Sequence, residues 1–184
     1  MPDPYLEDFN QYLLIVGKYI NEFTDLEHRV GRLCFDYSET TERAYRVFMA
    51  KRTQLGDMLG VLKKLIALQH FEDGVKVALR DAFNQLDHLI ALRHRMVHHG
   101  GHPLDTRQIL IRLKGEDISK ETKKNYDLYD LQELRDALID LNLIGRILMY
   151  RLDRTLGAEF RAAAAVNGVR HEPWRYKGRE LLPR

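Results

Sequence analysis

The stretch Leu-Arg-His-Arg-Met-Val-His-His-Gly over residues 92–100 places arginine and histidine side chains close together. Arg93 precedes His98 by five positions, and His94 and His99 are neighbours of the pair. Histidine exchanges protons near neutral pH, and the planar arginine fork binds two oxygens of one phosphate group. These residue types therefore fit cleavage of RNA by its own 2′-hydroxyl, which needs an acid, a base and a cation but no metal.

The element that must position these residues is a helix predicted over roughly 72–99. Gly100, Gly101 and Pro103 form a strong stop signal after it. The apolar residues of this helix recur at steps of three and four: Leu79, Phe83, Leu86, Ile90 and Val97. The missing step falls on Arg93 and His94. Ionisable groups inside a core cluster at functional sites, so the interruption predicts a polar site.

A second interruption lies in the first predicted helix, over roughly 5–37. Its apolar stripe consists of Phe9, Leu13, Val16, Ile20, Phe23, Val30, Cys34 and Tyr37. The stripe skips the position of Glu27, and a carboxylate on a buried face is costly unless it is paired. Glu27 then either forms a structural ion pair with Arg93 or holds Arg93 or a histidine in place within a functional site.

The remaining elements complete a predominantly helical chain. A second helix is expected over roughly 42–69, with Thr40 or Thr41 as its N-cap. Residues 107–113 and 126–129 alternate like strands and are expected to pair across a turn at 114–125. A last long helix begins near Asp130 and ends near 155–156, and a short helix is expected at 162–165. The fold class is therefore all-α, a bundle of four to five long helices with a small β-hairpin insert (105–129) before the last long helix.

Residues 93–98 resemble the Arg-x(4–6)-His motif of the HEPN superfamily. Arg93, the polar His94 and His98 match the motif with four intervening residues, and His99 matches it with five. Residues 23–27, Phe-Thr-Asp-Leu-Glu, are similar to the aromatic-x-x-Leu-Glu stretch of many such domains. The order of long helices also fits. The resemblance covers residues 5–157 and so indicates a HEPN-like domain over 1–157, followed by a basic and aromatic extension over 158–184.

The resemblance implies a homodimer and a metal-independent endoribonuclease, of the kind found in toxin–antitoxin and phage-defence systems. It implies that Arg93 and His98 of both subunits are catalytic, that His94, His99 and Glu27 support them, and that an antitoxin or regulatory protein is a further partner. A subgroup of the family carries a tyrosine two residues after the histidine, which a partner enzyme modifies. Gly100 stands there, so this regulation is not expected.

Composition narrows the class of protein. The 184 residues are 45% hydrophobic and 30% charged, with 29 Lys and Arg against 27 Asp and Glu. A net charge of +2 argues against binding nucleic acid by bulk charge. Local RNA contacts are instead expected from Arg95 and Arg107 and, in the extension, from Trp174 and Arg175. No apolar run reaches the ~18–20 residues of a membrane span, and the single cysteine suits a reducing compartment, so a cytoplasmic protein is expected.

The same residues allow other interpretations, namely a metal site, a docking segment and a non-catalytic binding module. His94 and His98, with His102 beyond, have the i, i+4 spacing of metal ligands. Arg95 stands where a metallopeptidase motif has glutamate, so no metal and no cofactor is expected. Cys34 lies on the apolar stripe and is expected to be inert core. The extension could instead dock on a partner subunit or pack loosely. The alternative function is a non-catalytic module of the same fold that binds RNA, a nucleotide or a protein partner.

Overall fold

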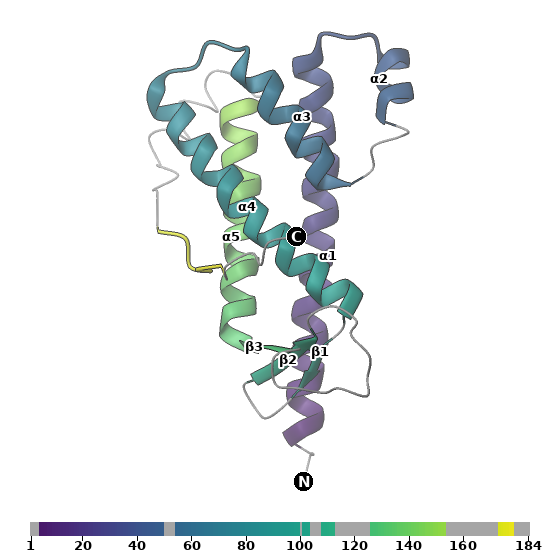
Figure 1. Ribbon diagram of the computed structural model, residues 1–184, viewed down its shortest axis with the longest axis vertical. Coiled ribbons are helices and arrows are strands. Elements are labelled where there is room, and N and C mark those ends of the chain that lie inside the picture. Colours follow the sequence, from purple (N-terminus) through teal and green to yellow (C-terminus); the bar gives the residue numbers. More distant parts are fainter. Residues whose placement is uncertain are drawn as a thin grey trace. The chain divides into compact units, whose positions relative to one another are not determined.

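The computed structural model describes residues 4–49, 54–99, 101–103, 108–112, 126–153 and 173–178. These residues form an all-α fold, a helical bundle to which a small sheet is attached (Figure 1). In chain order the elements are α1 Pro4–Ser38, α2 Glu42–Met49, α3 Leu55–Ala67, α4 Asp73–His99, β1 Gly101–Pro103, β2 Gln108–Arg112, β3 Tyr126–Asp130 and α5 Leu131–Leu152.

The helix ends follow local capping chemistry, and the predicted N-caps are confirmed. The Thr41 hydroxyl accepts a hydrogen bond from the Ala44 N–H, at 3.4 Å, at the start of α2. The Asp130 carboxylate accepts one from the Gln132 N–H at 2.7 Å, and Glu133 returns the contact by accepting from the Asp130 N–H at 2.8 Å. Asp130 and Glu133 thus form a reciprocal capping box for α5. Glu39, at φ 53°, ends α1 in the left-handed region.

The second predicted helix was wrong as a single element. Residues 42–69 form two helices, α2 of 8 residues and α3 of 13 residues. Helix α3 starts after Gln54, whose extended backbone (φ −87°, ψ 134°) is not helical. Gly56 and Gly60 both lie inside α3. The predicted short helix at 162–165 and the predicted end of the last helix near 155–156 lie outside the described residues.

The sheet has three antiparallel strands in the order β1-β2-β3. Strands β2 and β3 pair from Gln108 opposite Asp130 to Arg112 opposite Tyr126, as the alternating pattern predicted. Strand β1 pairs with β2 at Gly101 opposite Ile111 and was not predicted. The Gly-Gly-His-Pro stretch that stops α4 therefore also supplies an edge strand, where proline is tolerated.

The chain divides into two compact units. Unit 1 comprises Met1–Glu22, His88–Leu141 and Trp174–Arg184, and unit 2 comprises Phe23–Asp87 and Asn142–Pro173. The core of unit 2 is a set of buried side chains from its helices: Phe23, Leu26, Val30, Leu33, Leu59, Leu62, Leu79, Leu86, Ile144 and Leu148. Hydrogen bonds also link its helices. The Tyr37 hydroxyl of α1 donates to the Leu152 carbonyl of α5 at 3.0 Å, and the Lys63 ammonium of α3 donates to the Asp87 carboxylate of α4 at 2.9 Å.

Unit 1 contains the motif-bearing end of α4. Its core includes Tyr12, Ile15, Tyr19, Leu89, Leu92, Met96, Tyr129, Leu134, Ala137 and Tyr176. Four of these ten side chains are tyrosines, so unit 1 has a more polar core than unit 2. None of the helices in the described ranges is both long enough and apolar enough to span a membrane.

Candidate functional site

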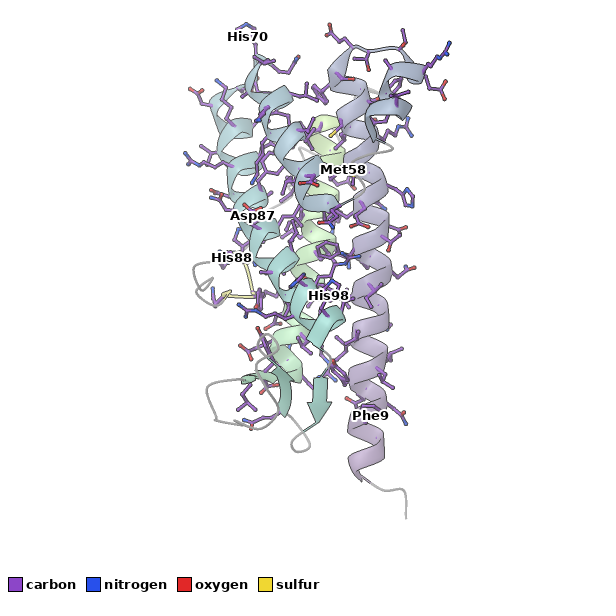
Figure 2. The ribbon with its side chains drawn as sticks, turned by 45° about the vertical axis from the view of Figure 1, so that its right-hand side comes forward. Phe9, Met58, His70, Asp87, His88 and His98 are labelled. Carbon is purple, nitrogen blue, oxygen red and sulfur yellow. The ribbon has the colours of Figure 1, made fainter. Side chains whose placement is uncertain are left out.

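The end of α4 presents its charged residues to two different environments. Leu89, Leu92 and Met96 are buried, and Arg93 lies half-buried among them. His94 and His98 are exposed, and their ring centroids are 4.5 Å apart. Figure 2 labels His98 near the C-terminal end of this helix. The motif therefore consists of an inward arginine and an outward histidine pair.

The apolar stripes predicted for α1 and α4 were wrong in unit 1. The structure buries Tyr12, Ile15 and Tyr19 of α1, whereas Leu13 is 49% and Ile20 is 36% exposed. On α4 it buries Leu89, Leu92 and Met96, whereas Val97 is 46% exposed. Both helices carry apolar residues on two faces. The buried face of α1 is the one that carries Tyr12 and Tyr19, and the buried face of α4 is the one that carries Leu89, Leu92 and Met96. Arg93 thus does interrupt a buried face, but His94 and His98 do not.

Arg93 and His98 do not share one face of α4. Five residues at about 100° each place them about 140° apart around the helix axis. His94 and His98, four residues apart, lie on one face and meet. The Arg93 and His98 side chains therefore leave α4 in different directions.

A cluster of tyrosines lies beneath the motif. Tyr19 is 1% exposed, and its hydroxyl donates to the Leu89 carbonyl at 2.9 Å. Burial raises the pKa of Tyr19 well above its usual value, the charges of Tyr176, Asp140 and Tyr129 raise the pKa further, and the Arg93 guanidinium lowers it. Arg93 and Asp140 thus act with opposite sign on one buried hydroxyl, which is expected to stay protonated at neutral pH.

Asp140 is a buried carboxylate that binds the end of the chain. It is 1% exposed on α5. Its two oxygens accept hydrogen bonds from the Arg175 N–H at 3.1 Å and the Tyr176 N–H at 2.8 Å. Residues 174–178 are called the C-terminal strap below. The strap inserts Tyr176, which is 4% exposed, into the tyrosine cluster, so this part of the extension packs on its own chain.

Arg95, predicted to contact RNA, has a structural partner. Its Nη1 donates to the Tyr129 hydroxyl at 2.7 Å and ties α4 to β3. Among the other predicted residues, Arg175 is exposed and Trp174 is half-buried. Glu27 is half-buried on the unit 2 part of α1, beside Leu26, which occupies the buried position that the predicted stripe left empty. Pairing of Glu27 with Arg93 stays a prediction.

Some predicted residues lie outside the described part of the chain. These are Arg107 and the side chains of His99 and His102. In the described ranges, no group of three or more His, Cys, Asp or Glu side chains is placed to hold a metal. Cys34 is 1% exposed in unit 2, and its thiol donates to the Met58 carbonyl at 3.4 Å. Burial raises the pKa of that thiol to about 11.

Tyr19, His88 and Asp140 were not predicted from the sequence. Asp140 stands three residues after Ala137 and four before Ile144 on the buried stripe of α5, so a charge among apolar residues is a signal that the sequence does carry. Tyr19 and His88 carry no such signal, since both residue types occur on buried and exposed faces alike.

Comparison with known proteins adds no relative. No protein-family model matches the chain, and neither the curated proteins nor the solved structures contain a significant match.

Proposed function

We propose that the protein is a metal-independent endoribonuclease of HEPN type that cleaves RNA in a site shared by two copies of the chain. His98 acts as general acid and base, and Arg93 binds and stabilises the phosphate. His94 contacts the phosphate beside His98, and His99 and Glu27 support the site. Arg95, Arg107, Trp174 and Arg175 are further RNA contacts. A toxin–antitoxin or phage-defence role in the cytoplasm, with an antitoxin as partner, belongs to the same proposal.

The observation that carries the proposal is the outward pair of His94 and His98 at the end of α4, next to the half-buried Arg93. An exposed imidazole can reach a substrate, and a second imidazole 4.5 Å away can share a phosphate or a proton with it. A guanidinium half-buried among Leu89, Leu92 and Met96 has fewer conformations to lose on binding. Both features favour a phosphate site over a solvated surface charge.

The shared site is supported by exposed aliphatic side chains in the unit that contains the histidines. Val97, next to His98 in the sequence, is 46% exposed, and α1 in the same unit exposes Leu13 (49%), Leu14 (58%) and Ile20 (36%). Exposed aliphatic side chains are frequent in protein interfaces. A second copy of the chain that covers these residues would bring its own Arg93 and His98 toward the first pair.

One observation favours the alternative, a non-catalytic module of the same fold that binds RNA, a nucleotide or a protein partner. In a single chain Arg93 and His98 lie about 140° apart on α4, so one chain does not assemble the catalytic pair. Binding by the exposed histidines needs no such assembly. Cleavage and its dependence on both residues therefore decide between the two functions.

The test is RNA cleavage by the purified protein in excess chelator, compared with His98→Ala, Arg93→Ala and Arg93→Lys. Loss of a general acid or base, or of the phosphate-binding cation, is expected to lower the cleavage rate by about 100-fold or more. His70→Ala and Arg80→Ala are matched controls, because both side chains are exposed and lie outside unit 1 (His70, Figure 2). The controls are expected to cleave like the wild type.

The shared site has a test of its own. An equimolar mixture of Arg93→Ala and His98→Ala chains is expected to regain part of the activity that each lacks alone, because mixed dimers combine intact residues from both chains. Circular dichroism melts identify any variant that has lost its fold. A wild type that cleaves none of a broad set of RNAs would refute the ribonuclease and leave the binding module, whereas cleavage abolished by the chelator would point to a metal site.

A further inference from the structure

The C-terminal strap is held within unit 1 by backbone hydrogen bonds and by one buried side chain. Its backbone N–H groups at Arg175 and Tyr176 bond to Asp140 of α5, and the Tyr176 ring is buried in the tyrosine cluster. A buried carboxylate without hydrogen-bond partners would destabilise the fold, so Asp140 needs the two backbone N–H groups of the strap. The strap is therefore a specifically bound segment and not a loosely packed terminus.

The strap ends on the imidazole of His88 at a position that only glycine fits. Gly178 has φ +68°, and a Cβ added to it would lie 2.9 Å from Nδ1 and 3.0 Å from Cγ of His88. Both the backbone conformation and the close approach exclude a side chain there. The His88 Nδ1 is buried beneath this contact and makes no hydrogen bond within the described ranges. Figure 2 shows His88 beside the trace of the strap.

Three contacts fix the part of α4 that carries Arg93, and the contact with the strap is one of them. His88 contacts Gly178 of the strap, the next residue, Leu89, accepts from the Tyr19 hydroxyl of α1 at 2.9 Å, and Arg95 donates to the Tyr129 hydroxyl of β3 at 2.7 Å. Arg93 lies between Leu89 and Arg95, the residues that make the second and third of these contacts. The segment 88–95 of α4 is thereby fixed to α1, to β3 and, through the strap, to α5.

We propose that the C-terminal strap holds the motif-bearing part of α4 in place, and that Asp140, Tyr176 and Gly178 are positioning residues for Arg93. Asp140 anchors the strap on α5, Tyr176 fills the space beside the buried Tyr19, and Gly178 places the strap against His88. The effect on RNA cleavage rests on the function proposed above, whereas the mechanical effect of the strap on residues 88–95 does not.

The test uses the full-length chain with Gly178→Ala, followed by amide hydrogen exchange and by RNA cleavage. The added methyl group is expected to displace the strap and to raise exchange at residues 88–95 by about tenfold. A misplaced Arg93 is expected to lower kcat by about tenfold or more, with a smaller change in KM. Lys177→Ala is the control, because within the described ranges this exposed strap residue donates only to the Trp174 carbonyl, and its removal leaves Asp140, Tyr176 and Gly178 intact.

A second substitution distinguishes positioning from general damage. In the double variant His88→Ala with Gly178→Ala the ring that the methyl group meets is gone, so exchange and kcat are expected to return part of the way to wild type. Asp140→Asn, which removes the anchoring charge, tests the other end of the strap and is expected to change exchange at residues 88–95 in the same direction as Gly178→Ala.

Each outcome decides the proposal. Unchanged exchange at residues 88–95 in both Gly178→Ala and Asp140→Asn would refute the strap as a support for α4. Raised exchange with wild-type kcat would refute the positioning of Arg93. A wild-type chain that cleaves no RNA would refute the proposed function, and the exchange measurements would then still decide whether the strap holds the helix.

Discussion

Among single residues, Asp140 shows how one buried charge organises its surroundings. It is 1% exposed, and it accepts hydrogen bonds from two backbone N–H groups of the strap. Removing one partner of a buried polar contact costs more than the contact itself contributes, because the remaining groups stay desolvated. Asp140 is therefore expected to be a strong determinant of stability as well as of position.

Asp140→Ala is expected to lower the free energy of unfolding by about 2–5 kcal/mol, since two N–H groups lose their acceptor and Tyr176 loses its anchor. Urea unfolding followed by circular dichroism measures this change. Asp136→Ala is the matched control on the same helix, because in the described part of the chain the Asp136 carboxylate accepts a hydrogen bond only from the exposed Gln132 side chain. Equal effects of the two substitutions would contradict the importance of the buried carboxylate.

Cys34 gives a prediction about alkaline pH. Burial raises the pKa of its thiol from 9.0 to about 11, so the unfolded chain loses this proton at lower pH than the folded chain does. The contribution of Cys34 to stability is then fully present below pH 9 and is lost as the pH rises toward about 11. Chemical unfolding at a series of pH values measures the loss, and alkylation of the native thiol at pH 8 is expected to be slow.

Cys34→Ala is the control for the alkaline prediction, because it removes the titrating group and leaves an apolar side chain. The fall in stability between pH 9 and 11 is expected to become smaller in this variant. Tyr19 and Tyr45, whose pKa values burial also raises, produce a further loss at higher pH that the variant retains. An identical pH profile in both proteins would contradict the role of Cys34.

At the scale of the elements, the capping box at the start of α5 fixes the junction between sheet and helix. Asp130 is both the last residue of β3 and the N-cap of α5. Asp130→Ala is expected to lower the free energy of unfolding by about 1 kcal/mol, the usual effect of removing an N-cap. Thermal unfolding of Asp130→Ala and of Arg146→Ala, an exposed substitution in the middle of α5, measures the difference.

A shift of the melting temperature in Arg146→Ala as large as that in Asp130→Ala would argue against the cap. Asp130→Asn is a useful third variant, because asparagine is an equally good N-cap residue and is expected to restore most of the stability. The comparison separates the hydrogen bond of the cap from the charge, whose interaction with the helix dipole is weak at an exposed site.

Most helix ends could be predicted from the sequence, although the break between α2 and α3 was missed. The buried faces of α1 and α4 were predicted correctly in unit 2, at residues such as Phe23, Val30 and Leu86, but not in unit 1. Thr41, Asp130 and the Gly-Gly stop act through neighbouring backbone groups, so their signals are local and were interpreted correctly. The buried face depends on which side chains meet across the unit. In α1 both Leu13 and Tyr12 begin an acceptable stripe, and only packing shows that Tyr12 is inside. The three-stranded sheet was predicted for β2 and β3 but not for the three-residue β1.

Only part of the candidate site could be predicted, because part of it depends on packing across the unit and not on local signals. Arg93 was correctly predicted to interrupt a buried face of α4, because apolar residues precede and follow it at helical spacing whichever stripe is chosen. The histidines were assigned to the wrong face, since the predicted stripe ran through Ile90 and Val97 rather than Leu89 and Met96. The cluster of Tyr19, Asp140 and Tyr176 joins three segments that are far apart in the sequence, since even Asp140 and Tyr176 are separated by 36 residues, and no local pattern brings them together.

For the whole molecule, the proposed shared site makes oligomeric state a testable property. The wild type is expected to have twice the mass of one chain in light scattering at micromolar concentration. Leu13→Asp and Val97→Asp place a charge on the exposed apolar side chains of α1 and α4 in unit 1, and each is expected to shift the mass to that of one chain. Loss of RNA cleavage is expected to accompany the shift.

Leu68→Asp is the matched control for these two substitutions. Leu68 is a more exposed leucine, at 78%, and it lies outside unit 1. A charge there is expected to leave the mass unchanged. A wild type with the mass of one chain would refute the shared site, and a dimer that survives both Leu13→Asp and Val97→Asp would place its interface elsewhere.

The strap also gives the protein an optical probe of its own. Trp174 is the single tryptophan of the 184 residues, and it stands one residue before the first N–H group that bonds Asp140. Indole emission shifts to longer wavelength when the ring becomes more exposed to water, and this ring is half-buried in the bound strap. The intrinsic fluorescence of the unlabelled protein therefore reports one local event, the attachment or release of its C-terminal segment.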